Sequence, residues 1–187
     1  PNLFSIATDG LQTVYGATYS PEQYFLKWRD DELVIKYGGD PKNKESSEGH
    51  LEVTLDSLLR PPNRLDIIDN FIVHEQTPEG INKKVARYQQ VRATNKIVDR
   101  VKEDEYQKGL VWHTQGSGKT LTMFFTAWKL RYDPDLDSPK IFVLIDRIDL
   151  DDQVYDDFVN HGGKHVVRVT SVKQLGEVIA SPEQGMF

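Results

Sequence analysis

The chain has 187 residues, of which 38% are hydrophobic and 28% charged, so its composition is that of a folded globular protein and excludes low-complexity and disordered classes. It contains no cysteine, which excludes disulfide bonds and cysteine-based metal or nucleophile sites, and no apolar run approaches the roughly 20 residues of a membrane span. The net charge of −6 argues against a dedicated nucleic-acid-binding protein. We therefore expect a cytoplasmic protein with no membrane partner.

The charge is distributed unevenly along the chain. Residues 1–80 carry 7 basic and 14 acidic side chains, net −7, whereas residues 81–187 carry 16 basic and 15 acidic ones, net +1. Residues 83–102 hold seven basic side chains and one acidic one. The acidic total therefore conceals a basic segment in the middle of the chain.

The N-terminal region predicts a small α+β segment. Residues 2–19 alternate around Asp9-Gly10, which is a strong signal for a β-hairpin turn. The sequence Ser-Pro-Glu-Gln at its start predicts a short helix over residues 20–28. Residues 36–49 are rich in Gly, Pro, Ser and charge, so we expect a loop or a domain boundary there.

Helical patterns dominate the middle of the chain. Two short helices are expected over residues 51–60 and 63–73, with a break at Pro61-Pro62, and a long helix over residues 82–101. Apolar residues three or four positions apart define the inward face of the long helix, and they are Ala86, Ala93, Ile97 and Val101. The same helix carries a basic stripe, Arg92, Lys96 and Arg100, which fits either a solvated face or a contact with a nucleic-acid backbone.

The C-terminal part alternates between strands and helices. Residues 110–112 predict a short buried strand and residues 141–145 a strand buried on both faces, with a third strand over residues 165–170. The expected helices cover residues 119–131, 149–158 and 172–180. This order predicts an α/β fold in which helices flank a parallel sheet.

The strongest motif lies between the first predicted strand and the helix after it. In the run His-Thr-Gln-Gly-Ser-Gly-Lys-Thr of residues 113–120, Gly116 and Gly118 allow backbone N–H groups to turn toward phosphate oxygens. Lys119 places a positive charge on the β- and γ-phosphates, and the Thr120 hydroxyl is a ligand for Mg²⁺. The usual first glycine is replaced by His113. The expected contacts with a nucleoside triphosphate, ATP, are Thr114, Gln115, Gly116, Ser117, Gly118, Lys119, Thr120 and Leu121, and Lys119 and Thr120 are the expected catalytic residues.

Gln90 shares the inward face of the long predicted helix, although a buried primary amide needs both donor and acceptor partners. An adenine edge offers both, so Gln90 is a candidate adenine contact. The alternative is a core glutamine bonded to the backbone, or a helix rotated so that Gln90 is exposed. On the pattern alone, this alternative is favoured.

Asp146 and Arg147 follow the strand predicted over residues 141–145, at the kind of edge where open parallel sheets bind ligands. Arg147 could meet a phosphate of nucleic acid, with Asp146 orienting it, or the acids could instead belong to the start of the next helix, with Asp149 as its N-cap. A phosphate-loop ATPase also needs an acidic residue at the end of another core strand, and no apolar strand of this sequence ends in an Asp-Glu pair. We therefore expect negligible ATP hydrolysis by this chain on its own.

Taken together, these motifs resemble the R (motor) subunit of type I restriction endonucleases. The feature typical of that family is Trp112-His113 before the phosphate loop. The resembling stretches, which span nearly the whole chain, are residues 2–10, 16–18, 24–28, 69–72, 83–90 with Ala93, 109–123 and 146–153.

The resemblance implies a RecA-like, superfamily 2 translocase that uses ATP and Mg²⁺ to move on double-stranded DNA before cleavage. Its partners would be the specificity and methylation subunits of a restriction-modification complex. Residues 1–45 would be the tail of the nuclease domain, residues 46–80 a helical linker, and residues 81–187 the beginning of the first motor lobe. The resemblance favours Gln90 as the adenine contact. It also implies that the chain is a central piece of a longer protein, with nuclease residues before it and the missing acid after it.

Two other classes of protein stay open. One is a different superfamily 2 DNA helicase or remodelling ATPase, and the other is a non-catalytic module that uses a nucleotide fold for assembly. The presence of Lys119 and Thr120 argues against the second of these.

Overall fold

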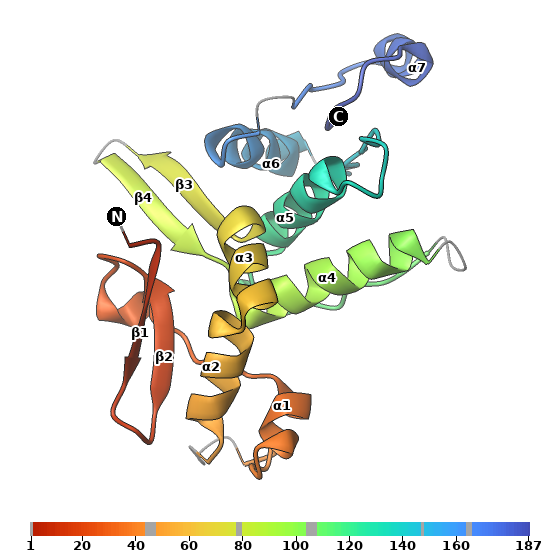
Figure 1. The fold of residues 1–187 in the computed structure, drawn as a ribbon. Coiled ribbons are helices and arrows are strands. Elements are labelled where there is room, and N and C mark those ends of the chain that lie inside the picture. The colour runs from red at the N-terminus through yellow and green to blue at the C-terminus, as the bar shows by residue number, and fades with distance from the viewer. Residues whose placement is uncertain (1, 44–47, 78–79, 104–107, 147, 164–165) are drawn as a thin grey trace. The chain divides into compact units, whose positions relative to one another are not determined.

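A computed structural model describes residues 2–43, 48–77, 80–103, 108–146, 148–163 and 166–187. The chain forms two compact units, Pro1–Val91 and Arg92–Phe187 (Figure 1). The fold is mixed α/β, with two antiparallel hairpins in the first unit. No helix in the described ranges has the length and apolar character needed to cross a membrane.

The first unit begins with the predicted β-hairpin. β1 (Phe4–Thr8) pairs with β2 (Thr13–Ala17) in antiparallel register. The Asp9 carboxylate accepts the backbone N–H groups two and three residues later, at 2.8 and 2.6 Å, and so closes the turn. These two hydrogen bonds hold the pKa of Asp9 below its usual value. The hairpin prediction is confirmed.

Helices of the first unit differ in part from those predicted. Over residues 20–28 the structure has only a 3₁₀ turn, η1 (Glu22–Tyr24), because the chain at Leu26 forms a β-bridge with Tyr15 and cannot continue as a helix. The first α-helix, α1 (Asp31–Lys36), starts later, where the Asp30 side chain accepts two backbone N–H groups at the N-cap.

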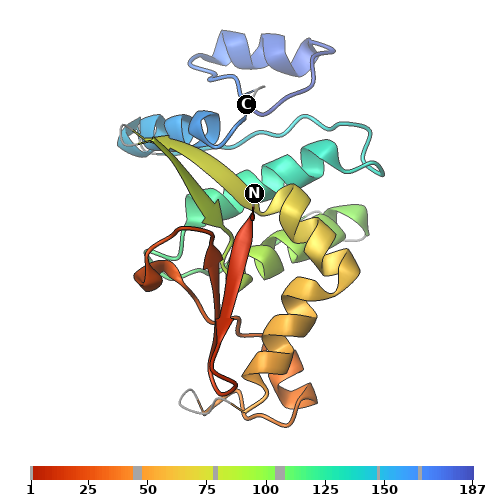
Figure 2. The same ribbon diagram turned by 60° about the vertical axis from the view of Figure 1, so that its left-hand side comes forward.

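Two consecutive helices, α2 (His50–Leu59) and α3 (Pro61–Asn70), follow, and in Figures 1 and 2 α3 continues from α2 after a bend. The predicted break at Pro61 is confirmed, because α3 begins at that residue. Proline is tolerated in the first turn of a helix but not in its interior. The second predicted helix ends earlier than expected, since Ile72 already starts a strand.

The second hairpin corrects the prediction of a helix over residues 82–101. β3 (Ile72–Thr77) pairs with β4 (Gly80–Val85) in antiparallel register, so the backbone groups of residues 80–85 bond across the ladder rather than along a helix. The helix, α4 (Tyr88–Lys102), begins only after this strand.

The inward face of α4 is also rotated from the predicted one. Val91, Thr94 and Val98 are buried on α4, whereas Val101 is 47% exposed. The prediction had used Val101 to define the inward face, and that part of it is wrong.

The second unit contains three further helices close to their predicted ranges. These are α5 (Lys119–Tyr132), α6 (Ile148–Asn160) and α7 (Val172–Ala180). Phe124 of α5 and Phe158 of α6 are both buried and meet edge to face, with ring centroids 5.3 Å apart. This pair forms part of the core of the unit.

Among the described residues of the second unit, parallel pairing is limited to two isolated bridges. Met186 forms parallel bridges with Ile141 and with Val166, and the N–H of Val167 donates to the C=O of Met186 at 2.9 Å. Across residues 92–103, 108–146, 148–163 and 166–187, no longer strand is formed. The chain direction at these bridges is the parallel one that was predicted, but a parallel sheet is not formed here.

Two predictions about burial are wrong. Leu110 and Trp112 are 85% and 87% exposed and belong to no strand, because no described strand pairs with residues 110–112. Residues 141–145 were expected to be buried on both faces, yet Phe142 and Leu144 are exposed while their neighbours are half-buried. Such alternation is what an extended segment shows when only one of its faces is covered.

Candidate functional site

The run of residues 113–120 forms a turn that leads directly into α5. Gly116 and Gly118 have φ values of +75° and +79°, in the left-handed region that glycine adopts without steric cost. The N–H of Ser117 donates to the C=O of Thr114 at 3.3 Å, which closes the turn. Gly118 is the N-cap, and Lys119 is the first residue of the helix. We call residues 113–120 the phosphate loop.

Lys119 reaches back across this loop. Its Nζ donates to the C=O of Thr114 at 2.9 Å, and its side chain is exposed. The positive charge therefore lies over the turn, close to the start of α5, where the helix dipole also favours an anion.

The loop has the properties required to hold phosphate groups and Mg²⁺. A Cβ atom built on Gly116 would meet no atom within 4 Å, so the space beside the loop is open. Thr114, Gln115 and Gly116 are exposed, whereas Ser117 is buried. Thr120 lies in the first turn of α5 and is half-buried. Backbone N–H groups at a helix start, one cation and one hydroxyl are groups that could bind a Mg²⁺–triphosphate.

Gln90 lies in the first unit and is 2% exposed. Its Oε1 accepts the backbone N–H of Arg87 at 2.8 Å, and because α4 begins at Tyr88 this is the contact that a residue at the third position makes to the N-cap. The structure thus shows the backbone-bonded glutamine that the pattern alone favoured. A contact between Gln90 and adenine stays a prediction.

Of the proposed DNA contacts, Asp146 is exposed just before α6, and Arg147 lies outside the described residues. Asp149 was a candidate N-cap, but α6 starts at Ile148, so Asp149 is already within its first turn. The sequence has two histidines four positions apart, at 161 and 165, and of these only His161 is described. Its ring lies 5.6 Å from that of Phe124, and among the described side chains no group of three metal-binding residues occurs.

Residues 89–187, which include all of the phosphate loop, match the model of the SWI2/SNF2 ATPase family. The chain belongs to the SWI2/SNF2 ATPase family. Its match begins within α4 and covers the whole second unit.

Curated relatives give a second comparison for this SWI2/SNF2 ATPase chain. It is 33% identical to the type I restriction enzyme HindI endonuclease subunit of Haemophilus influenzae, over 96% of this chain and 17% of that protein. It is 30% identical to the putative type I restriction enzyme MjaIXP endonuclease subunit of Methanocaldococcus jannaschii, over 97% of this chain and 18% of that protein. The chain therefore spans less than a fifth of the length of these relatives. The resemblance to type I restriction endonuclease subunits is confirmed.

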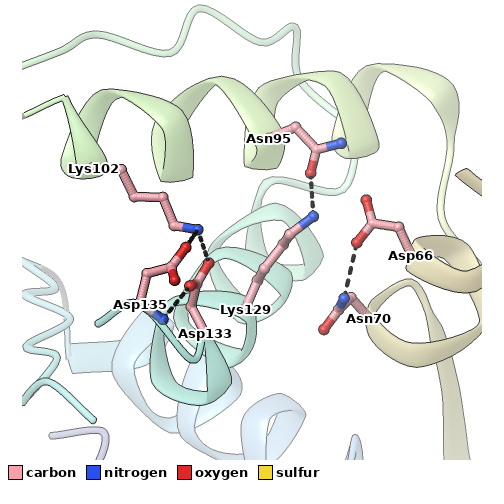
Figure 3. Close-up of polar contacts among 7 residues, drawn as sticks. All are labelled: Asp66, Asn70, Asn95, Lys102, Lys129, Asp133 and Asp135. Carbon is pink, nitrogen blue, oxygen red and sulfur yellow. Dashed lines mark hydrogen bonds and ion pairs between the residues drawn. The ribbon is translucent and has the colours of Figure 1, made fainter. Parts of the chain in front are cut away.

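Several polar contacts within the second unit of this SWI2/SNF2 ATPase chain join α4 to α5, and Figure 3 shows some of them. Lys129 of α5 donates to Asn95 of α4 at 2.7 Å. Lys102, in the last turn of α4, lies between Asp133 and Asp135, which follow α5, at 2.7 and 2.8 Å. Hydrogen bonds from Lys102 to these two acids, Asp133 first, raise the pKa of Lys102 to about 12.

Asp133 shows the complementary shift. Its partial burial acts to raise its pKa, but the bonds from Lys102 and from the N–H of Asp135 outweigh that effect, so its pKa is lowered overall. These contacts fix α4 against the helix that the phosphate loop opens.

Sequence reasoning missed one ionic cluster and one buried polar series. Arg168 bonds to Asp151 at 2.6 Å and to Asp152 at 2.7 Å and so ties α6 to the extended segment after it. Thr94 and Thr126 are buried and lie with their Oγ1 atoms 3.3 Å apart. Neither set has a motif, because its members are far apart in sequence and their residue types are common on helices.

Proposed function

We propose that the chain binds Mg²⁺–ATP through the phosphate loop. The observation that carries this proposal is the geometry at the start of α5, where two left-handed glycines precede Lys119 and the space beside Gly116 is open. Backbone N–H groups at the helix start would hold the phosphate oxygens, and the side chains of Thr114, Gln115 and Ser117, with Leu121 of α5, would line the phosphate site.

Each site residue then has one role. The Lys119 ammonium group neutralises charge on the β- and γ-phosphates, and the Thr120 hydroxyl contributes a ligand to Mg²⁺, which supplies charge stabilisation during phosphoryl transfer. For Gln90 we propose adenine recognition, which would use the amide group that is now bonded to Arg87. Arg147 is proposed to contact a phosphate of the DNA backbone, with Asp146 orienting it.

At the level of the whole protein, we propose the role of an ATP-dependent DNA translocase and endonuclease subunit of a type I restriction-modification system. The names of the curated relatives and the match to an ATPase family both support this role. Double-stranded DNA and the specificity and methylation subunits would be the partners. Residues 1–45, 46–80 and 81–187 would then be the nuclease tail, the linker and the beginning of the motor lobe.

A second candidate is another superfamily 2 DNA motor, such as a remodelling ATPase. The family match is compatible with it, because the matched model is that of an ATPase and covers residues 89–187 only. The relatives that cover 96% and 97% of the chain favour the restriction subunit instead, since the match includes the first unit as well as the motor segment.

The test of nucleotide binding compares wild type with Lys119→Ala and with Lys173→Ala, an exposed lysine of α7 that serves as a matched control. A hydrogen bond to a charged group contributes about 1.5–3 kcal/mol, so we expect Lys119→Ala to weaken Mg²⁺–ATP binding by roughly ten- to hundredfold. Lys173→Ala should bind as wild type does in the same calorimetric titration. Equal affinities for wild type and Lys119→Ala would rule the proposal out.

A further inference from the structure

Three buried threonines connect α4 to the phosphate loop within the second unit. Thr94 of α4 is 0% exposed, and Thr122 and Thr126 of α5 are 4% and 9% exposed. The Oγ1 atoms of Thr94 and Thr126 lie 3.3 Å apart. Thr126 Oγ1 lies 2.7 Å from the C=O of Thr122, and Thr122 Oγ1 lies 3.3 Å from the C=O of Gly118. We call Thr94, Thr126 and Thr122 the threonine ladder.

The direction of the hydrogen bonds in the threonine ladder follows from proton counting. A hydroxyl group has one proton to donate. Thr126 donates its proton to the C=O of Thr122, and Thr122 donates its own to the C=O of Gly118. The bond between the remaining pair must therefore use the proton of Thr94. All three hydroxyl groups donate toward the phosphate loop.

The last acceptor is the residue at which the loop becomes a helix. Gly118 is the N-cap of α5, with φ +79° and ψ +48°, and Lys119 follows it directly. Its C=O also accepts the N–H of Thr122 at 3.1 Å. The threonine ladder thus ends on the peptide group that sets the angle between the loop and the first turn of α5.

One part of this arrangement is not explained by local helix chemistry. Threonine hydroxyls inside helices commonly bond to the C=O four residues earlier, which accounts for Thr122 and Thr126 taken alone. Thr94 comes from a different helix and is fully buried. Burial of a third hydroxyl at that position has a cost unless the hydroxyl is bonded, and it is bonded to Thr126.

We propose that the threonine ladder positions the phosphate loop for Mg²⁺–ATP, with Thr94 and Thr126 acting through Thr122 on Gly118. This inference rests on the proposed nucleotide binding and adds three positioning residues to it. The ladder holds the start of α5 at one angle to α4, so the N–H groups of the loop keep one direction. None of the three threonines touches the nucleotide in this proposal.

The test measures stability and affinity in the same set of variants. Thr126→Val removes the hydroxyl but keeps the branched shape, Thr126→Ser keeps the hydroxyl, and the double variant Thr94→Val with Thr126→Val removes both members of the pair between helices. Binding of a fluorescent ATP analogue with Mg²⁺ and thermal melting are recorded for the whole chain. One hydrogen bond corresponds to about a two- to tenfold change in affinity, so we expect Thr126→Val to raise the dissociation constant by that factor.

The expected pattern separates positioning from stability. Thr126→Ser should restore the wild-type dissociation constant. The double valine variant should regain melting temperature relative to Thr126→Val, because it leaves no buried hydroxyl unbonded. Its dissociation constant should nevertheless stay raised. If the double variant regains affinity together with stability, or if Thr126→Val binds as wild type does, the positioning role is wrong. Lys119→Ala serves as the reference. If Lys119→Ala bound the analogue as wild type does, the proposed nucleotide site would be refuted, and with it the inference that the threonine ladder positions that site.

Discussion

Replacing Tyr15 with phenylalanine tests how the first unit is held together. Tyr15 is fully buried on β2, and its O–H donates to the C=O of Ala86 at 3.0 Å, across 71 residues of sequence. Its ring contacts that of Trp28, with centroids 5.3 Å apart. The substitution Tyr15→Phe removes one hydroxyl group and leaves the ring contact in place.

The size of the effect follows from the burial of both partners. Ala86 is 1% exposed, so its C=O loses the Tyr15 donor where water has little access. A buried polar group left without a partner costs about 1–3 kcal/mol. For a unit of this size, 1 kcal/mol corresponds to about 4–8 °C in melting temperature. We therefore expect Tyr15→Phe to lower the melting temperature of the first unit by at least about 4 °C.

The assay is thermal melting followed by near-ultraviolet circular dichroism, with Tyr24→Phe as the control. Tyr24 is 61% exposed, so the loss of its hydroxyl should change the melting temperature little. If Tyr15→Phe and Tyr24→Phe melt within about 1 °C of each other, the Tyr15 hydroxyl does not stabilise the unit and the reasoning from burial is refuted.

The same residue predicts a dependence on alkaline pH. Burial raises the pKa of the Tyr15 phenol above its usual value. The folded-state pKa therefore exceeds the unfolded one, so the contribution to stability is fully present below about pH 10 and is lost as the pH rises through the folded value. In urea unfolding, the free energy of unfolding of wild type should fall in that pH range, whereas that of Tyr15→Phe should fall less. Identical alkaline profiles would contradict this expectation.

Three further predictions concern the second unit. Gly116→Ala and Gly176→Ala both place a Cβ in open space, but only Gly116 has a positive φ. In urea unfolding, Gly116→Ala should therefore destabilise the chain by about 1–2 kcal/mol and also weaken nucleotide binding, while Gly176→Ala, in α7, should stabilise it by about 0.5–1 kcal/mol. Equal changes in stability for the two variants would contradict the role of φ. Lys102 helps to lower the pKa of Asp133, so the Asp133 carboxylate stabilises the fold above its usual pKa and this stabilisation is lost as the pH falls through its folded-state pKa. Lys102→Met should therefore lose less stability than wild type on acidification below about pH 4. An unchanged acid profile in urea unfolding would refute the ion pair with Asp133 as its cause. The purified chain should show negligible ATP hydrolysis in a phosphate-release assay, because no apolar strand of this sequence ends in an Asp-Glu pair, and robust turnover would disprove that.

Local signals predicted much of the fold. The Asp9-Gly10 hairpin, the proline break before α3 and the helices α5 and α7 follow from turn chemistry, capping and periodicity, all of which act over a few residues. The phosphate loop could be placed for the same reason, because its glycines, lysine and threonine are consecutive. The roles of the individual residues in that loop are implied by the motif, and binding experiments on the variants test them.

Other features depend on partners that local patterns do not reveal. Residues 80–85 have a polar, lysine-containing sequence that resembles an exposed helix, and only pairing with β3 makes them a strand. Residues 110–112 are apolar and yet exposed, because a strand needs a neighbouring backbone and no described segment supplies it. The threonine ladder escaped prediction because Thr94 and Thr126 are 32 residues apart and come together only when α4 meets α5.

The central claim is that the phosphate loop binds the phosphates of a nucleotide together with Mg²⁺. It is tested most directly by titrating the chain with ATP, ADP and AMP in the presence of Mg²⁺ and comparing the dissociation constants. The loop is built for the β- and γ-phosphates, so ATP and ADP should bind at least roughly tenfold more tightly than AMP, and Lys119→Ala should abolish that difference. Equal affinities of wild type for ATP and AMP, or a difference that persists in Lys119→Ala, would contradict the claim.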